Sequence, residues 1–184
     1  MYPHTLWRLR RPGKLAISSA MQLTGLQRTG LVGAVLAGAG LGVALASESF
    51  AGLVPCALCL VERWPYRAAI LLGALALASP RGARLMVGLT ALAMLAAAVL
   101  GGVHVGVEAG WWPSPLPECA APVLGGGTMA ERLARMPARP AKPCDEPTYL
   151  IPAIPLSMAA MNMIFATALA LGLAVAIVRE RRVG

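Results

Sequence analysis

Four cysteines carry the clearest chemical potential of this sequence. Cys56 and Cys59 form a CxxC pair, whereas Cys119 and Cys144 are separated by a long segment. A CxxC pair can form a disulfide, bind a metal or exchange electrons with another dithiol, and four cysteines allow three disulfide pairings. Redox exchange is the favoured interpretation, ahead of two structural disulfides. No metal site is predicted, because zinc would require all four thiolates to converge.

The surroundings of the CxxC pair favour a reactive thiolate. Pro55 suits the start of a helix, so both cysteines are predicted at a helix N-terminus, where unpaired N–H groups and the helix dipole stabilise negative charge. Arg63 follows Cys59 by about one helical turn. It is predicted to stabilise a thiolate at Cys59 or to donate a hydrogen bond to a carbonyl of a bound ligand. The alternatives are a lipid headgroup anchor or an ion pair with Glu62.

Two further polar residues are candidate ligands of a cofactor. Glu62, like Arg63, is predicted near the lipid boundary, where a charge is costly and usually serves a site, a partner or a snorkelling contact. His104 lies near the end of another apolar segment. A histidine there can relay protons or bind a polar ligand, although a hydrogen-bonded packing role is slightly favoured.

The elements that must position these residues are apolar and long. The chain has 184 residues, of which 58% are hydrophobic and 13% charged, and its mean hydropathy is +0.68. A soluble domain could not bury that much apolar surface, whereas a lipid bilayer is crossed by about 20 apolar residues in a helix. Alternation with period two is absent. The sequence therefore predicts an all-α integral membrane protein with four spans, at about 29–46, 56–78, 85–107 and 153–178.

The charge distribution predicts the orientation of these spans. Ten basic residues lie on one side of a four-span chain, and basic residues mark the cytoplasmic side; they are Arg8, Arg10, Arg11, Lys14, Arg28, Arg81, Arg84, Arg179, Arg181 and Arg182. Segment 1–28 and tail 179–184 are thus predicted to be cytoplasmic. This topology accounts for the net charge of +8 and argues against nucleic-acid binding. A cleaved signal peptide is the less favoured interpretation of the first span, which is long for a signal core.

The segment 108–152 is predicted to be a long extracytoplasmic loop. It contains nine prolines and the run Gly125, Gly126 and Gly127, so it should have little core of its own. All four cysteines then lie on the extracytoplasmic side, where disulfides persist. Residues 129–136 could form a short amphipathic helix that lies either on the membrane surface or against the protein.

The motifs around the cysteines resemble those of the disulfide bond formation protein B family. They are PCALCLVER at 55–63, WWPSPLPEC at 111–119, CDEP at 144–147 and LSMA at 156–159. The resemblance covers roughly residues 31–178 and includes all four cysteines. One departure is the segment 149–155, which has two prolines where relatives often have an aromatic, glycine-containing stretch.

The resemblance implies an antiparallel four-helix bundle in the bacterial inner membrane, with a bound quinone, either ubiquinone or menaquinone. It implies a periplasmic thioredoxin-fold dithiol partner similar to DsbA. Cys119, disulfide-bonded to Cys144, would form the mixed disulfide with that partner, and the Cys56–Cys59 disulfide would reoxidise the loop pair. Cys59 would then meet the quinone, assisted by Arg63.

Two other functions compete with a thiol:quinone oxidoreductase. A vitamin K epoxide reductase-like enzyme would use similar chemistry on a different quinone. A small transporter or membrane scaffold would use the cysteines only for structural disulfides, which would be inert toward a reduced partner protein.

Overall fold

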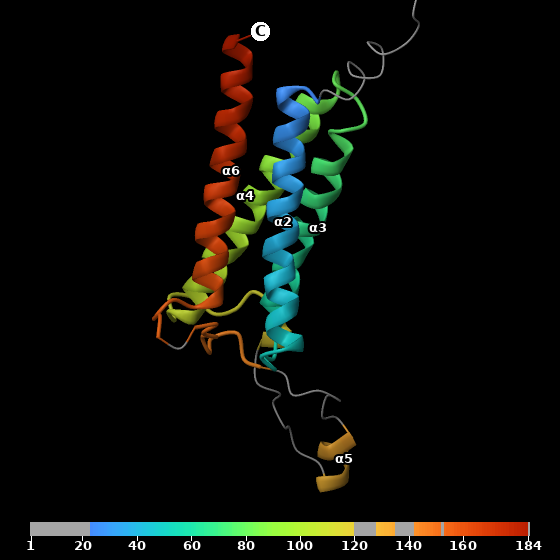
Figure 1. Cartoon of the computed structure of the whole chain (residues 1–184). Helices are drawn as coiled ribbons and strands as arrows, with labels where there is room; N and C mark the ends of the chain where they lie inside the picture. The colour runs from blue at the N-terminus through green and yellow to red at the C-terminus, as the bar shows by residue number, and fades with distance from the viewer. Residues whose placement is uncertain (1–22, 120–127, 135–141, 152, 184) are drawn as a thin grey trace, which may run out of the picture.

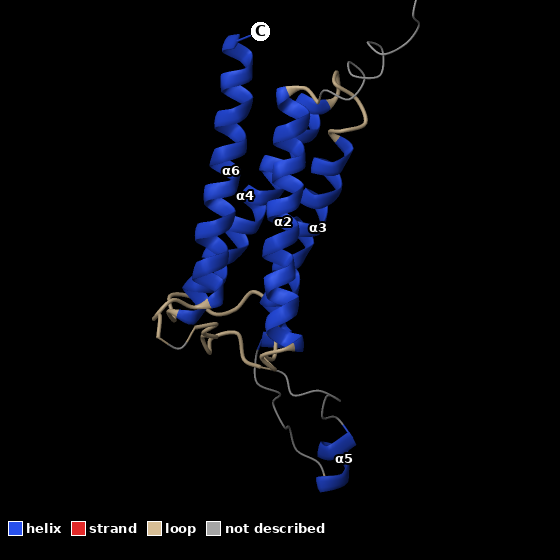
Figure 2. Ribbon diagram, in the orientation of Figure 1, coloured by secondary structure: helices blue, strands red, loops and turns tan. Residues whose placement is uncertain are grey.

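The computed structural model is all-helical in the residues that it describes, which are 23–119, 128–134, 142–151 and 153–183. No strand occurs among them, which confirms the predicted all-α class for this part of the chain. The long helices there are α2 (Gly25–Ser49), α3 (Ala57–Leu75), α4 (Ala83–Glu108) and α6 (Met158–Val183) (Figure 2). A 3-10 turn, η1 (Pro117–Cys119), and a short helix, α5 (Met129–Ala134), belong to the segment between α4 and α6.

The four long helices lie side by side, and successive ones run in opposite directions (Figure 1). α4 packs along α6 and α3, and α3 also packs along α2. The start of α3 and the end of α4 therefore lie at the same end of the bundle, together with the start of α6 (Figure 1). The starts of α2 and α4 and the C-terminal end of α6 lie at the opposite end.

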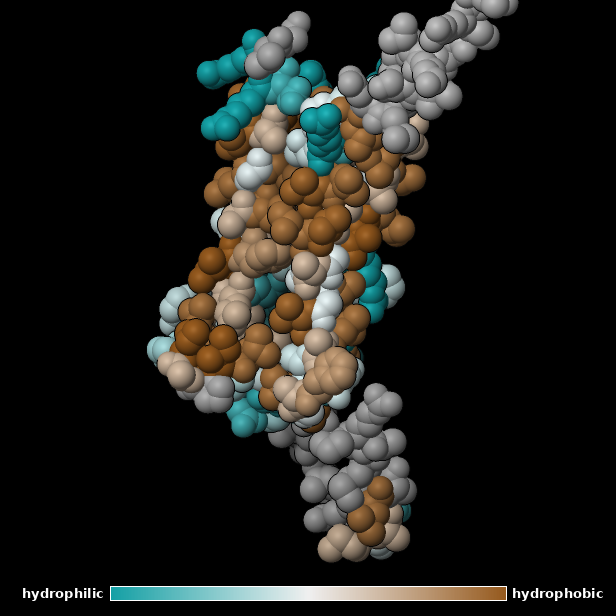
Figure 3. Space-filling model, viewed as in Figure 1, coloured by the Kyte–Doolittle hydropathy of each residue, from teal (hydrophilic) through white to brown (hydrophobic). Residues whose placement is uncertain are grey.

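Three of the helices are long and apolar enough to cross a membrane, namely α2, α4 and α6. Hydrophobic side chains cover most of the face shown in Figure 3, and hydrophilic ones gather around the C-terminal end of α6. Among the described long helices, α3 is not apolar enough to count as a span by composition. Its 19 residues include three charged ones, Glu62, Arg63 and Arg67. The structure thus supports a multi-pass membrane protein, and the fourth span remains a prediction.

The ends of α2 and α6 differ from the predicted spans for local reasons. α2 begins earlier than position 29 because Thr24 and Gln27 form a capping box. It continues through Ser49, so the last part of the helix extends into the predicted connection. α6 begins at Met158 rather than near 153, because Pro155 disfavours helical backbone before it and Ser157 Oγ accepts a hydrogen bond from the N–H of Ala160 at 3.2 Å.

Small residues set the spacing between α2 and α3. A Cβ atom added to Gly73 would lie 2.6 Å from the carbonyl oxygen of Gly30, and one added to Gly30 would lie 2.6 Å from the Cβ of Ala76. Such distances leave room only for hydrogen, so the two backbones approach closely, as small residues allow in lipid. α2 and α3 are therefore in close contact toward the end away from the CxxC pair.

Parts of the segment between α4 and α6 are described. α5 contains six residues of the predicted amphipathic helix, and its Met129 and Leu133 are exposed, so packing against the described protein is not observed. Several sequence predictions concern residues outside the described ranges: the basic residues before position 15, the glycine run at 125–127 and Met136.

Candidate functional site

The CxxC pair lies at the N-terminus of α3, as its sequence context predicts. Cys56 is the N-cap residue, and its Sγ accepts a hydrogen bond from the N–H of Cys59 at 3.2 Å. Both cysteines are free, with their Sγ atoms 2.7 Å apart. A disulfide requires a separation of about 2.05 Å, so the pair can close with a sulfur movement of less than about 1 Å. The local geometry suits interconversion between a dithiol and a disulfide.

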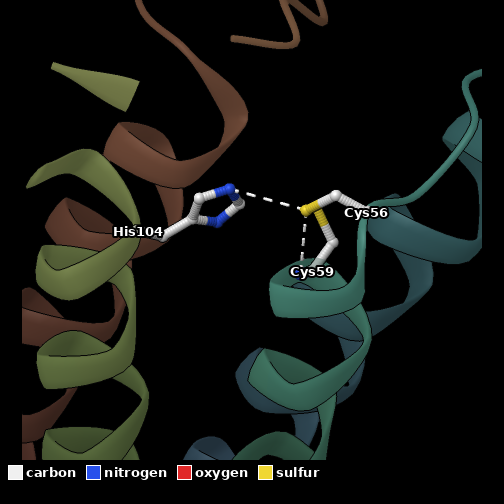
Figure 4. Close-up of side chains that lie close together, drawn as sticks. All are labelled: Cys56, Cys59 and His104. Carbon is white, nitrogen blue, oxygen red and sulfur yellow. Dashed lines mark hydrogen bonds between the residues drawn. The ribbon is translucent and has the colours of Figure 1, made fainter. Parts of the chain in front are cut away.

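His104 extends from α4 toward the CxxC pair (Figure 4). Its Nε2 lies 3.5 Å from Cys56 Sγ, and its Nδ1 lies 2.7 Å from Glu62 Oε1. The imidazole is 3% exposed. A buried imidazole between a thiol and a carboxylate can accept the thiol proton, because the carboxylate stabilises the imidazolium that forms.

Glu62 belongs to a longer chain of buried hydrogen bonds. Its Oε2 accepts a hydrogen bond from Asn162 Nδ2 at 2.7 Å, and Asn162 Oδ1 accepts one from the hydroxyl of Tyr66 at 2.5 Å. Together with the contacts of His104, this chain leads from the Cys56 thiol to Tyr66 through side chains of α3, α4 and α6. Both oxygens of the Glu62 carboxylate are therefore satisfied inside the bundle.

Arg63 forms its ion pair with Glu48 of α2. The alternative prediction of an Arg63–Glu62 pair is wrong, because Glu62 faces His104 and Asn162 instead. Arg63 is 8% exposed, and its buried Nε has no hydrogen-bond partner among the described residues. A buried donor without a partner is costly.

A cavity of about 260 Å³ lies between these side chains. Its polar lining includes Cys59, Glu62, Arg63, Tyr66, His104 and Asn162. Most of the remaining lining is apolar and comes from α2, α6 and the segments that precede α3 and α6. Cys59 contributes to the cavity, whereas Cys56 is not among its lining residues. Concave, largely apolar sites with a few polar groups are typical of small-molecule binding.

The loop cysteines pack against the CxxC pair. Cys119 and Cys144 form a disulfide with an S–S distance of 2.03 Å, which is the pairing that the family resemblance implies. Both are buried in one cluster with Cys56, Leu58 and Val107. The tertiary structure thus brings the two cysteine pairs together at one end of the bundle.

All seven predicted site residues lie at this end, but their partners were not foreseen. Sequence reasoning missed three polar residues: Glu48, which pairs with Arg63, Asn162, which bonds to Glu62, and Tyr66, which bonds to Asn162. Two of these carried a usable signal, because Tyr66 follows Glu62 by one helical turn and Asn162 is a polar residue inside an apolar segment. Glu48 lacked such a signal, since its position had been assigned to a connection.

Comparison with known proteins gives one match. The protein-family model described as Disulfide bond formation protein DsbB matches residues 27–176, which include all four cysteines. No curated protein and no solved structure matches the chain significantly.

Proposed function

The chain belongs to the disulfide bond formation protein DsbB family, and from this premise we propose that it is a membrane thiol:quinone oxidoreductase. Family membership indicates a membrane oxidoreductase that forms disulfides. The proposal adds the electron acceptor, the protein substrate and the roles of individual residues. It also adds a fourth membrane span formed by α3, whose charged residues Glu62 and Arg63 are paired inside the bundle.

One observation carries the proposal: the CxxC pair has two different faces. Cys56 is buried in the cluster that contains the Cys119–Cys144 disulfide and does not line the cavity, whereas Cys59 packs against that cluster and also lines the cavity. Cys56 is therefore suited to thiol–disulfide exchange with the loop pair, and Cys59 is suited to contact with a small electron acceptor. A structural role for both disulfides would require neither this contact nor the cavity.

The substrate half of the reaction takes place at the loop pair. A thiolate of the reduced partner attacks Cys119, the Cys119–Cys144 bond breaks, and Cys144 leaves as a thiolate. The partner's second thiolate then displaces Cys119, so the partner leaves oxidised and the loop pair holds the two electrons and two protons. Exchange with the Cys56–Cys59 disulfide restores the loop disulfide and leaves the CxxC pair as a dithiol.

The second half returns the CxxC dithiol to a disulfide. This step releases two electrons and two protons. His104 lies beside Cys56 and accepts its thiol proton, while Glu62 stabilises the resulting imidazolium. His104 and Glu62 both line the cavity, so the proton taken from the thiol can reach an acceptor there through these two side chains.

The cavity fits a quinone headgroup. A bound ubiquinone or menaquinone would accept the two electrons and two protons. Arg63 would hold it together with Cys59, Glu62 and His104, because all four residues line the cavity. The apolar lining from α2 and α6 suits the rest of such a lipid-soluble molecule.

The arrangement of charges supports a periplasmic position for the cysteines. Arg28 and Arg84 lie near the starts of α2 and α4, and Arg181 and Arg182 lie in the last turn of α6. All of these belong to the end of the bundle opposite the CxxC pair (Figure 1). Basic residues mark the cytoplasmic side, so both termini are assigned to the cytoplasm and the partner to the periplasm, with a thioredoxin fold similar to DsbA.

The experiment uses the full-length protein in lipid nanodiscs with a reduced thioredoxin-fold dithiol protein. We expect oxidation of that protein to require added quinone. Cys59→Ser should abolish quinone reduction, and Cys119→Ser should prevent capture of the partner in a mixed disulfide. Full quinone-dependent turnover by Cys59→Ser would contradict the mechanism. Disulfides that stay inert toward the reduced partner would favour the scaffold or transporter alternative.

A further inference from the structure

Cys56, Cys59 and His104 also form a group of three side chains that can bind a metal ion. The Sγ atoms of Cys56 and Cys59 and a ring nitrogen of His104 all lie within 4.8 Å of one another, and the three side chains point toward a common centre (Figure 4). We propose that these three side chains, when the cysteines are reduced, bind a zinc-class divalent ion that blocks the site. Such a site does not need all four cysteines, because its third ligand is an imidazole from another helix.

The distances suit tetrahedral coordination after one small adjustment. Zinc lies about 2.3 Å from thiolate sulfur and about 2.0 Å from imidazole nitrogen, so a tetrahedral ion separates sulfur from nitrogen by about 3.5 Å and two sulfurs by about 3.8 Å. Cys56 Sγ and His104 Nε2 are 3.5 Å apart. The two sulfurs are 2.7 Å apart, so Cys59 Sγ must move outward by about 1 Å.

The hydrogen bonds around the ligands are those expected of a metal site. Metal-binding histidines usually donate their other ring N–H to a carboxylate, which fixes the tautomer and the ring orientation. Glu62 supplies that carboxylate, 2.7 Å from Nδ1, and Asn162 holds its second oxygen. The N–H of Cys59 donates to Cys56 Sγ, which stabilises a thiolate there. Nε2 is consequently free to face the two sulfurs.

Three protein ligands leave one coordination position open. Cys59 and His104 both line the cavity, so water can occupy that position and an ion can enter through the cavity. Thiolate and imidazole ligands favour zinc over magnesium and calcium, which prefer oxygen. An open site of this kind should exchange its ion more readily than a closed four-cysteine site.

Binding is restricted to one redox state. One divalent ion, two thiols and a neutral imidazole combine to form the complex, two protons are released, and no electrons are transferred. A Cys56–Cys59 disulfide has no thiolate to offer, so the oxidised pair should not bind. The ion would hold the pair in the reduced state and prevent both exchange with the loop pair and electron transfer. This inhibitory consequence rests on the proposed function, whereas the binding itself does not.

The test measures Zn²⁺ affinity by competition with a chromogenic chelator. The protein is the full-length chain with Cys119→Ser and Cys144→Ser, quinone-free and reduced, so that only the CxxC thiols remain. We expect one Zn²⁺ per chain, and none after oxidation or in Cys59→Ser. Glu62→Gln should weaken binding by about 10- to 100-fold, the usual effect of removing an outer hydrogen bond, and His104→Gln by at least as much. His4→Gln, which alters the other histidine, is the matched control.

The proposal is overturned if zinc binding survives oxidation, survives Cys59→Ser, or responds equally to His4→Gln and His104→Gln. A separate measurement follows quinone reduction by the unsubstituted protein with and without Zn²⁺, with recovery after chelation as the expected result. Absent zinc binding with normal quinone reduction would reject the metal site alone. Zinc binding without any quinone reduction would instead reject the proposed function.

Discussion

Arg63 provides the sharpest test of the proposal that the cavity binds a quinone. The side chain is paired with Glu48 and also lines the cavity. A hydrogen bond from a charged donor contributes about 1.5–3 kcal/mol, which corresponds to a factor of about 10 to 150 in affinity. Arg63→Ala should therefore raise the KM for quinone by at least about tenfold and leave kcat nearly unchanged, because the interaction lost is one of binding.

The substitution also leaves Glu48 without its partner, and this second effect must be separated from the first. The Glu48 side chain is 26% exposed, so water can partly replace the lost partner and the protein should still fold. The double variant Arg63→Ala with Glu48→Gln removes the stranded charge. If the lost quinone contact dominates, the double variant should keep the raised KM while regaining thermal stability.

The assay is steady-state quinone reduction at saturating reduced partner, with quinone concentration varied. Arg67→Ala is the matched control: it removes the same charge from the same helix, one turn further along. Arg67 stacks on Trp64, with its guanidinium carbon 4.9 Å from the ring centroid, and does not line the cavity. An unchanged KM in Arg63→Ala, or an equal rise in Arg67→Ala, would refute the assigned role of Arg63.

Three further predictions concern the proton acceptor, the helix contact and the start of α6. His104→Gln should lower kcat for quinone reduction by about 10²- to 10⁴-fold, the usual contribution of a general base, while the mixed disulfide with the partner still forms in a trapping assay. Gly73→Ala should destabilise the protein by about 1–3 kcal/mol, because the new Cβ would meet the Gly30 carbonyl; Gly88→Ala, which meets nothing within 4 Å, should not lower the thermal denaturation midpoint. Ser157→Ala should cost at least about 1 kcal/mol, because it removes both the N-cap and the hydrogen bond that Ser157 Oγ donates to Glu108. The loss is detected in the same thermal measurement, and no loss would argue against the capping role.

The family and the helical class could be predicted from local sequence. The apolar runs approach or exceed the length that a bilayer requires, and the CxxC motif follows a proline that suits a helix start. Both signals depend on residues close together in the chain, so they are legible without a structure. α3 is harder to recognise as a membrane span from composition. Glu62 and Arg63 lower the hydropathy of this segment, and the sequence does not show that each of them has a partner on another helix.

The partners of the polar residues could not be predicted in the same way. Glu62 bonds to Asn162, a hundred positions away, and Arg63 bonds to Glu48 rather than to its neighbour. Which groups meet depends on the rotation of each helix about its axis and on how closely the helices approach. Those quantities are set by packing contacts spread over the whole bundle, such as the approach of Gly30 to Gly73.

The sequence by itself determined a helical membrane protein of the DsbB family with two cysteine pairs and a small set of polar residues near one of them. Only the tertiary structure decided that Cys56 is clustered with the loop disulfide while Cys59 faces the cavity, and that His104 lies against Cys56. The physical reason is that hydropathy and motif spacing depend only on residues within one segment of the chain. The position of a sulfur relative to an imidazole on another helix is instead fixed by the packing of the entire bundle.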